Sequence, residues 1–180
     1  MIGEFYKANA IPGSDLGNAT AETAFPDLFG KANILTIPPD GQLINRRMTV
    51  YLAGQVQTTT NVGFTINIYF VSTTNNVATS TQIFTTNQQT VNNLKTNWHL
   101  DVNLYWDSAS NNMNGLVIGQ VANSIIGPAA FANIPVADPN AHNNTQQNYP
   151  VSYSFVAKAF FSSSSTGNHA ILNMERVSFL

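Results

Sequence analysis

The sequence predicts an all-β protein, an antiparallel jelly-roll β-sandwich of about eight strands. Three observations support this prediction. Apolar and polar residues alternate with a period of two in several segments. No long segment carries apolar residues at the spacing of three and four that is typical of a helix. Turns rich in Asn, Gly, Pro and Ser separate the alternating segments, so neighbouring strands are expected to pair antiparallel without helical crossovers.

Three segments alternate most clearly, namely 64–70, 94–106 and 151–161. Each is predicted to form a strand with one face in the core and the other in water or against a polar neighbour. In 94–106 the apolar face comprises Leu94, Thr96, Trp98, Leu100, Val102, Leu104 and Trp106.

Weaker patterns predict five more strands, at 34–37, 46–54, 80–85, 115–126 and 170–180. Turns are expected between them at 38–41, 73–76, 107–115 and 162–168. In the last run the apolar positions shift from Leu172 and Met174 to Val177 and Phe179. This shift predicts a β-bulge near 173–176.

Two regions fall outside these strands. Residues 1–33 are predicted to be an N-terminal arm that packs on the domain or reaches a neighbour, and residues 34–180 the sandwich domain. The arm contains a small apolar cluster, Phe25, Leu28 and Phe29. Residues 127–150 hold three prolines and a polar run, and are expected to form a long loop. Loops of this length are usually functional or interface-forming.

The composition restricts the function. Charged residues make up 9% of the 180 residues, against about 25% in ordinary domains, and the net charge is −2. Polar character comes instead from 24 Asn, 18 Thr, 13 Ser and 9 Gln. There is no cysteine and no basic patch beyond Arg46 and Arg47. Thiol catalysis and disulfides are therefore excluded, and no nucleic-acid partner is expected.

No signal peptide and no apolar stretch of roughly 20 residues is recognisable, which predicts a soluble protein made in a cytoplasm, with no membrane partner.

Few residues suggest chemistry. His99 and Asp101 share the polar face of 94–106 and could form a metal or acid–base pair, but a solvated cross-strand hydrogen bond is favoured. His142 and His169 lie in expected loops without a carboxylate at ligand spacing, and are interpreted as polar surface. The segment 107–115 resembles a calcium loop only superficially, because Ala109 occupies a ligand position and no Glu closes it. A hairpin turn is favoured there.

No catalytic motif is found. The sequence contains no Gly-x-Ser-x-Gly elbow, no glycine-rich phosphate loop and no conspicuous carboxylate pair. We therefore expect no enzymatic activity, no cofactor and no bound metal.

Aromatic residues on the faces opposite the predicted core are the remaining candidates. They are Tyr51, Tyr69, Tyr105 and Phe160. Such rings can stack on carbohydrate, become buried between subunits, or simply belong to a half-covered sheet face. With Phe25, Leu28 and Phe29 of the arm, they form the candidate interface.

Several segments resemble one family. The ending, 155–163 followed by 168–172 and 177–180, resembles the closing hairpin of the jelly-roll decoration (cement) and head-fibre proteins of tailed bacteriophages. Residues 35–54 are similar to the opening strands of that family, and 98–104 followed by 115–119 resembles its central hairpin. The resemblance covers about residues 34–126 and 151–180 and is one of pattern.

The resemblance implies a homotrimer on the outside of an icosahedral capsid, made in the host cytoplasm and bound to the major capsid protein. Its function would be structural, as a decoration subunit that stabilises the shell of the virion. The alternative is a carbohydrate- or receptor-binding β-sandwich module of a phage fibre. A cupin-like metal enzyme is the third possibility, and the wide spacing of the three histidines argues against it.

Overall fold

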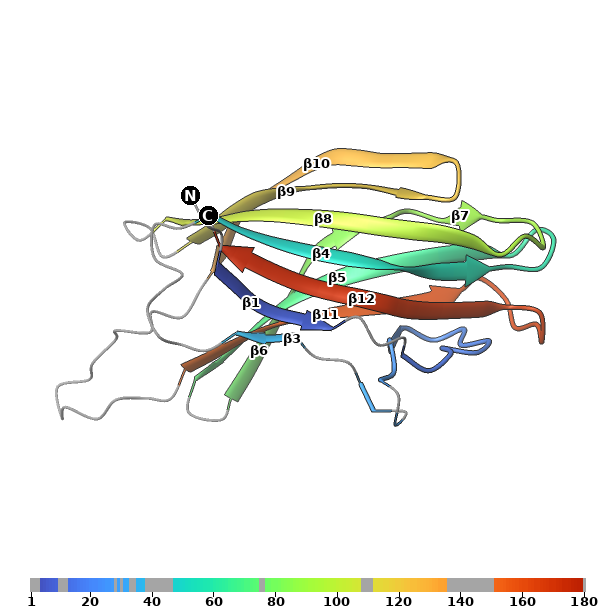
Figure 1. Cartoon of the computed structure of the whole chain (residues 1–180), viewed down its shortest axis with the longest axis horizontal. Coiled ribbons are helices and arrows are strands. Elements are labelled where there is room, and N and C mark those ends of the chain that lie inside the picture. The colour runs from blue at the N-terminus through green and yellow to red at the C-terminus, as the bar shows by residue number, and fades with distance from the viewer. Residues whose placement is uncertain are drawn as a thin grey trace, which may run out of the picture.

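The computed structural model of the chain describes residues 4–9, 13–27, 29, 31–32, 35–37, 47–74, 77–107, 112–135 and 151–179. These residues form twelve strands and no helix. The strands build two antiparallel sheets that pack face to face, so the predicted all-β sandwich is confirmed (Figure 1).

The larger sheet has six strands in the order β1-β12-β4-β8-β9-β10. Their bounds are β1 Glu4–Asn9, β12 His169–Phe179, β4 Arg47–Gln57, β8 Thr96–Asp107, β9 Asn112–Val121 and β10 Ser124–Pro135. The β8–β9 pair runs from Trp98 opposite Val121 to Asp107 opposite Asn112, which confirms the predicted central hairpin. Its connecting residues 108–111 lie outside the described residues.

The smaller sheet has the order β2-β11-β5-β6, with β3 also pairing with β11 and β7 with β5. The bounds are β2 Thr23–Ala24, β11 Val151–Phe161, β5 Gly63–Thr74, β6 Val77–Thr85, β3 Leu35–Ile37 and β7 Gln89–Thr90. Because β11 and β12 lie in different sheets, their connection is an arch between the sheets, and the expected closing hairpin is wrong. The jelly-roll form of the sandwich stays a prediction.

Alternate side chains of the long strands fill the space between the sheets, as the sequence pattern predicts. The buried residues of β5, β8 and β11 are Phe64, Ile66, Ile68, Phe70, Trp98, Leu100, Val102, Leu104, Tyr153, Phe155, Ala157, Ala159 and Phe161. Leu94 is an error of the prediction, since it precedes β8 and is 71% exposed. Asn92 and Asn93 have positive φ and turn the chain just before it. The side chain of Trp106 lies outside the described residues.

A glycine allows the largest core side chain to pack. A Cβ atom on Gly54 in β4 would lie 2.7 Å from the Trp98 ring and 2.0 Å from the carbonyl oxygen of Ile171. Trp98 therefore lies across the backbone of its neighbouring strand, in a space that only glycine leaves open.

The region after β8 differs from the prediction. The run 115–126 is two strands, because the chain turns at Ala122, with φ of 53°, and Asn123. The second of them, β10, extends to Pro135, so the first part of the predicted loop 127–150 is a strand. Residues 136–150, which include His142, lie outside the described residues.

The predicted bulge in the last strand is confirmed, with a register shift between Leu172 and Met174. The extra residue is Asn173, at the start of the predicted range. Met174 consequently points outward and is 39% exposed, whereas Glu175 and Val177 point inward and are buried. The shift moves the inward face from Leu172 to Glu175, so a carboxylate takes an inward position.

The described parts of the N-terminal segment, residues 4–9 and 13–27, form an edge of both sheets. β1 pairs with the second half of β12. The chain continues along β12, where Leu16 N donates to Ala170 O at 2.8 Å, and then crosses to β11, where Phe25 N donates to Ala157 O at 3.1 Å. The described part of the expected arm is thus built into the sandwich, and it closes one side of it (Figure 1).

Candidate functional site

The three candidate residues of the N-terminal region have different environments. Phe25 is fully buried, and its ring stacks on that of Trp98 at a centroid distance of 5.5 Å. As a core residue it has no surface to offer a partner, so its assignment to an interface is wrong. Phe29 is 86% exposed. Leu28 lies outside the described residues.

Tyr69 on the smaller sheet holds the N-terminal segment. Its hydroxyl lies 2.8 Å from Glu22 Oε1 and donates to that carboxylate, and the same oxygen accepts a hydrogen bond from Asn67 Nδ2 at 2.7 Å. Lys158 Nζ lies 4.3 Å from the centre of the Tyr69 ring. Burial and the Glu22 carboxylate raise the pKa of Tyr69 to about 12. The Tyr69 hydroxyl and the Asn67 amino group therefore already have a partner within the chain. Phe160, also on this sheet, is half-buried.

Tyr51 and Tyr105 point outward from the larger sheet. Tyr51 stacks on His99 at a centroid distance of 6.3 Å, and the guanidinium carbon of Arg176 lies 5.4 Å from the Tyr51 ring centre. The expected cross-strand hydrogen bond of His99 is replaced by this ring contact. Tyr105 is 43% exposed.

The outward side of the larger sheet, called here the open face, comprises the outward side chains of β4, β8, β9 and β12. Those of β4 and β8 between Thr49 and Gln57 and between Asn97 and Tyr105 are half-buried or exposed throughout. On β5 of the other sheet, by contrast, Thr65 and Asn67 are less than a tenth exposed although they point outward. The open face at β4 and β8 is thus less covered than the outer face at this part of β5.

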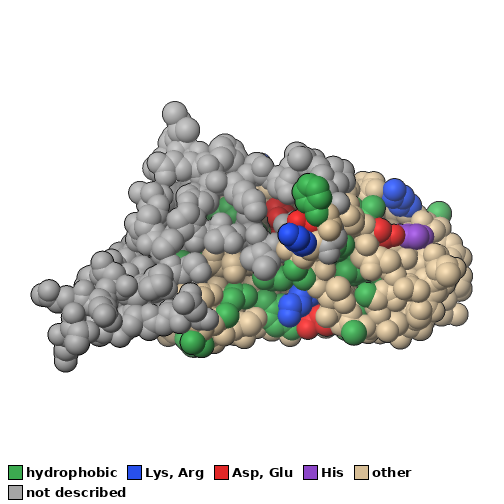
Figure 2. All heavy atoms as spheres, turned by 90° about the horizontal axis from the view of Figure 1, so that it is seen from below, with side chains coloured by type: hydrophobic (Ala, Val, Ile, Leu, Met, Phe, Trp, Pro, Cys, Tyr) green, Lys and Arg blue, Asp and Glu red, His purple; other side chains and the backbone are tan. Residues whose placement is uncertain are grey.

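The open face combines apolar and amide groups and carries few charges. Cross-strand rows place Tyr51 beside Asp101 and Ile118, and Thr49 beside Asn103 and Leu116. Ile118 is 43% exposed. The described surface at right angles to it is likewise dominated by uncharged side chains and backbone (Figure 2). Such a face makes contacts through area and hydrogen bonds rather than through net charge.

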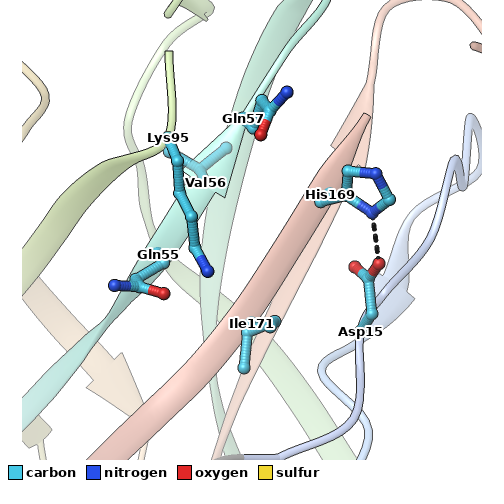
Figure 3. A pocket seen from close by; sticks show the side chains of 7 residues that line it. All are labelled: Asp15, Gln55, Val56, Gln57, Lys95, His169 and Ile171. Atoms are coloured by element: carbon cyan, nitrogen blue, oxygen red, sulfur yellow. Dashed lines mark hydrogen bonds and ion pairs between the residues drawn. The ribbon is translucent and has the colours of Figure 1, made fainter. Parts of the chain in front are cut away.

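A cavity of about 190 Å³ lies at one end of the open face (Figure 3). Its lining comprises Asp15, Gln55, Val56, Gln57, Lys95, His169 and Ile171. Lys95 and Gln55 stand on one side of the cavity, and Asp15 and His169 face each other on the other.

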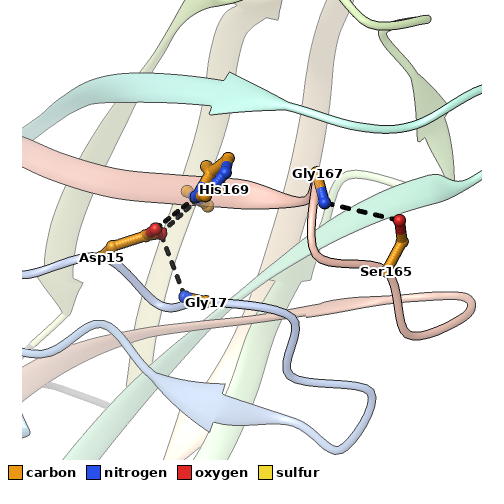
Figure 4. A network of polar contacts seen from close by, with 6 residues as sticks. Asp15, Gly17, Ser165, Gly167 and His169 are labelled. Carbon is orange, nitrogen blue, oxygen red and sulfur yellow. Dashed lines mark hydrogen bonds and ion pairs between the residues drawn. The ribbon is translucent and has the colours of Figure 1, made fainter.

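Asp15 ties the N-terminal segment to the start of β12 (Figure 4). Its Oδ2 pairs with His169 Nδ1 at 2.5 Å, and its Oδ1 accepts hydrogen bonds from the backbone N–H groups of Ala170 and Gly17, both at 3.0 Å. Partial burial would raise the pKa of Asp15, but the hydrogen bonds from His169, Gly17 and Ala170 lower it below 3.8 overall. The interpretation of His169 as a loop residue without a carboxylate partner is wrong, because it begins β12 and pairs with Asp15, 154 residues away in the sequence.

The Asp15–His169 pair lacks the remaining parts of a hydrolytic triad. Nucleophilic catalysis needs a hydroxyl or thiol that donates to the second ring nitrogen. No described residue provides one, and the nearby Ser165 hydroxyl instead accepts from Gly167 N at 3.4 Å. Nor do three or more potential metal ligands gather anywhere in the described ranges. The geometry fits an anchor for the N-terminal segment.

Comparisons with known proteins found no protein similar to this chain. No family model, no curated protein and no solved structure matches the chain. No helix suited to crossing a membrane occurs in the part of the chain that the structure describes.

Proposed function

We propose that the protein is a non-enzymatic structural subunit of a virion, which binds the outside of an icosahedral capsid and stabilises the shell as a decoration protein. The open face carries this proposal. It is broad and carries few charged side chains, and it exposes Tyr105, Ile118 and Met174 by 39–43% each. Exposed apolar groups on a sheet rimmed by polar side chains are typical of protein contact surfaces.

The subunit would attach through the large surface area that it buries against the capsid. Each copy would bury part of its open face against the major capsid protein, and a homotrimer would multiply these contacts. At roughly 25 cal/mol per Å² of apolar surface, a contact of standard size can hold a subunit without any strong ion pair, once the cost of association is subtracted.

The test is cosedimentation with purified heads of the virus that encodes the sequence, stripped of their outer proteins. Ile118→Asp places a charge on the open face and should weaken binding at least about tenfold, because the carboxylate would be desolvated without a partner. Val77→Asp is the matched control, since Val77 is 68% exposed on the smaller sheet. Absence of binding, or equal binding by both variants, would contradict the proposal. Light scattering should give three times the chain mass of 19.5 kDa.

The second candidate is a carbohydrate- or receptor-binding module of a phage fibre. One observation favours it, namely that the exposed ring of Tyr105 lines a hollow together with amide side chains. An exposed aromatic ring beside amides can stack on a sugar and hydrogen-bond its hydroxyl groups.

A further inference from the structure

The end of the open face opposite the Asp15–His169 cavity holds a hollow of about 430 Å³. This volume lies within the range of roughly 300–1,000 Å³ usual for small-ligand sites. Its outward side chains come from three neighbouring strands and are Arg47, Thr49, Asn103, Tyr105, Asn114 and Leu116.

The strand register fixes the layout of this hollow. Arg47 lies opposite Tyr105, and Tyr105 lies opposite Asn114. Opposed residues on neighbouring strands have Cβ atoms about 4.5–5.5 Å apart. The row from the guanidinium across the ring to the amide is therefore about 10 Å wide, enough for one sugar ring to lie over Tyr105.

Internal hydrogen bonds occupy the amide oxygens of this hollow, so the side-chain groups that stay available to a ligand are mainly hydrogen-bond donors. Thr49 Oγ1 donates to Asn103 Oδ1 at 2.9 Å, and Asn133 N donates to Asn114 Oδ1 at 2.9 Å. Each amide oxygen is thus used within the sheet, which fixes the amide orientation and leaves the amino group available as a donor. Arg47 adds a guanidinium that pairs with no carboxylate of the described residues. None of the lining residues that the structure describes is Asp or Glu.

We propose that this hollow binds a sugar carrying a carboxylate group, of the uronate or sialate class. The carboxylate would accept hydrogen bonds from Arg47 and an adjacent asparagine amino group, and the sugar ring would stack on Tyr105. A neutral sugar fits less well, because its hydroxyl groups also need acceptors. The biological role of this site rests on the second candidate function, carbohydrate or receptor binding. The binding chemistry itself does not depend on attachment to a capsid.

The test is titration of the full chain, followed by NMR or calorimetry, with methyl glucuronide and N-acetylneuraminate as the two acidic probes. Methyl glucoside and acetate are the neutral-sugar and bare-anion comparators. We expect at least one acidic sugar to bind in the millimolar range, and both comparators to bind at least about tenfold more weakly, as the loss of a charged hydrogen bond implies. The preferred probe distinguishes uronate from sialate. No binding of either acidic sugar, or equal binding of glucoside or acetate, would overturn the proposal.

Variants locate the binding. Arg47→Gln should weaken the preferred sugar at least about tenfold, because it removes the charged donor. Lys95→Gln removes one positive charge at the opposite cavity and should leave affinity unchanged. Tyr105→Leu should weaken binding severalfold, while Tyr105→Phe should retain it. Equal effects of the two charge variants, or of the two Tyr105 variants, would overturn the assignment. Capsid cosedimentation is a separate measurement, so either proposal can fail while the other holds.

Discussion

Replacing Phe25 by Ala measures how firmly the N-terminal segment belongs to the sandwich. Phe25 has no exposed surface and stacks on Trp98 in the centre of the core. Truncation of a fully buried Phe costs about 3–5 kcal/mol, from lost transfer energy and the cavity left behind. Since whole domains are stable by about 5–15 kcal/mol, this loss is a large share of the total. In a chain of this size it corresponds to a melting temperature lower by about 6–20 °C.

The assay is unfolding in urea, followed by tryptophan fluorescence, with thermal unfolding by circular dichroism as a second probe. Phe29→Ala is the control four positions away, since Phe29 is 86% exposed and its truncation should change stability by no more than about 0.5 kcal/mol. If Phe25→Ala destabilises the protein by less than 1 kcal/mol or so, as little as the control, the segment is a separable arm and the reasoning fails.

Three more predictions concern the same architecture. Asp15→Asn should lower stability at neutral pH, and its difference from wild type should shrink as the pH falls below 3.8, because the folded-state pKa of Asp15 is lowered and its contribution disappears on protonation; unfolding curves at pH 7 and pH 3 test this. Gly54→Ala should destabilise by about 1–3 kcal/mol or more, since its Cβ would press on Trp98 and on backbone; a normal melting temperature would contradict it. Asn168→Ala should cost about 1–3 kcal/mol, since the backbone N–H of Thr59 loses its acceptor at 3.0 Å; hydrogen exchange at that amide would report the loss.

The sequence pattern located the long strands because burial on one face imposes a period of two on the side chains. The structure buries the residues that the pattern selects in 64–70 and 153–161, although Val156, on the outward face, is also buried. The alternating pattern does not locate a turn that is formed by residues uncommon in turns. Ala122 adopts a positive φ at the β9–β10 turn, and alanine is not a residue that signals such a turn.

The Asn-rich composition has a partial explanation in the backbone. Five of the six described non-glycine residues with positive φ are Asn, at 61, 87, 92, 93 and 133. Asn tolerates the left-handed region better than other side chains. These positions lie in turns or at a register irregularity of β10, where asparagine takes the role that glycine often has.

The site could not be predicted in the same way, because its contacts join distant segments. Asp15 and His169 are 154 residues apart, and no local spacing connects them. The burial of Phe25 likewise depends on the segment crossing from β12 to β11, which no short pattern encodes. Tyr51 and Tyr105 were placed correctly on an outward face, since that follows from strand parity alone.

The surroundings of Tyr69 and of Tyr105 differ in how many polar groups already have partners, and this difference bears on both proposals. On the smaller sheet Glu22 engages Asn67 and Tyr69, so a ligand there would have to displace existing hydrogen bonds. On the open face the amino groups beside Tyr105 and the exposed side chain of Ile118 face outward, so contact there adds interactions instead of exchanging them. A contact made by neutral groups at Ile118 should depend little on ionic strength, whereas a carboxylate held by Arg47 should bind less tightly as salt screens the pair. Measuring both interactions at low and high salt therefore separates attachment by area from recognition by charge on the same sheet.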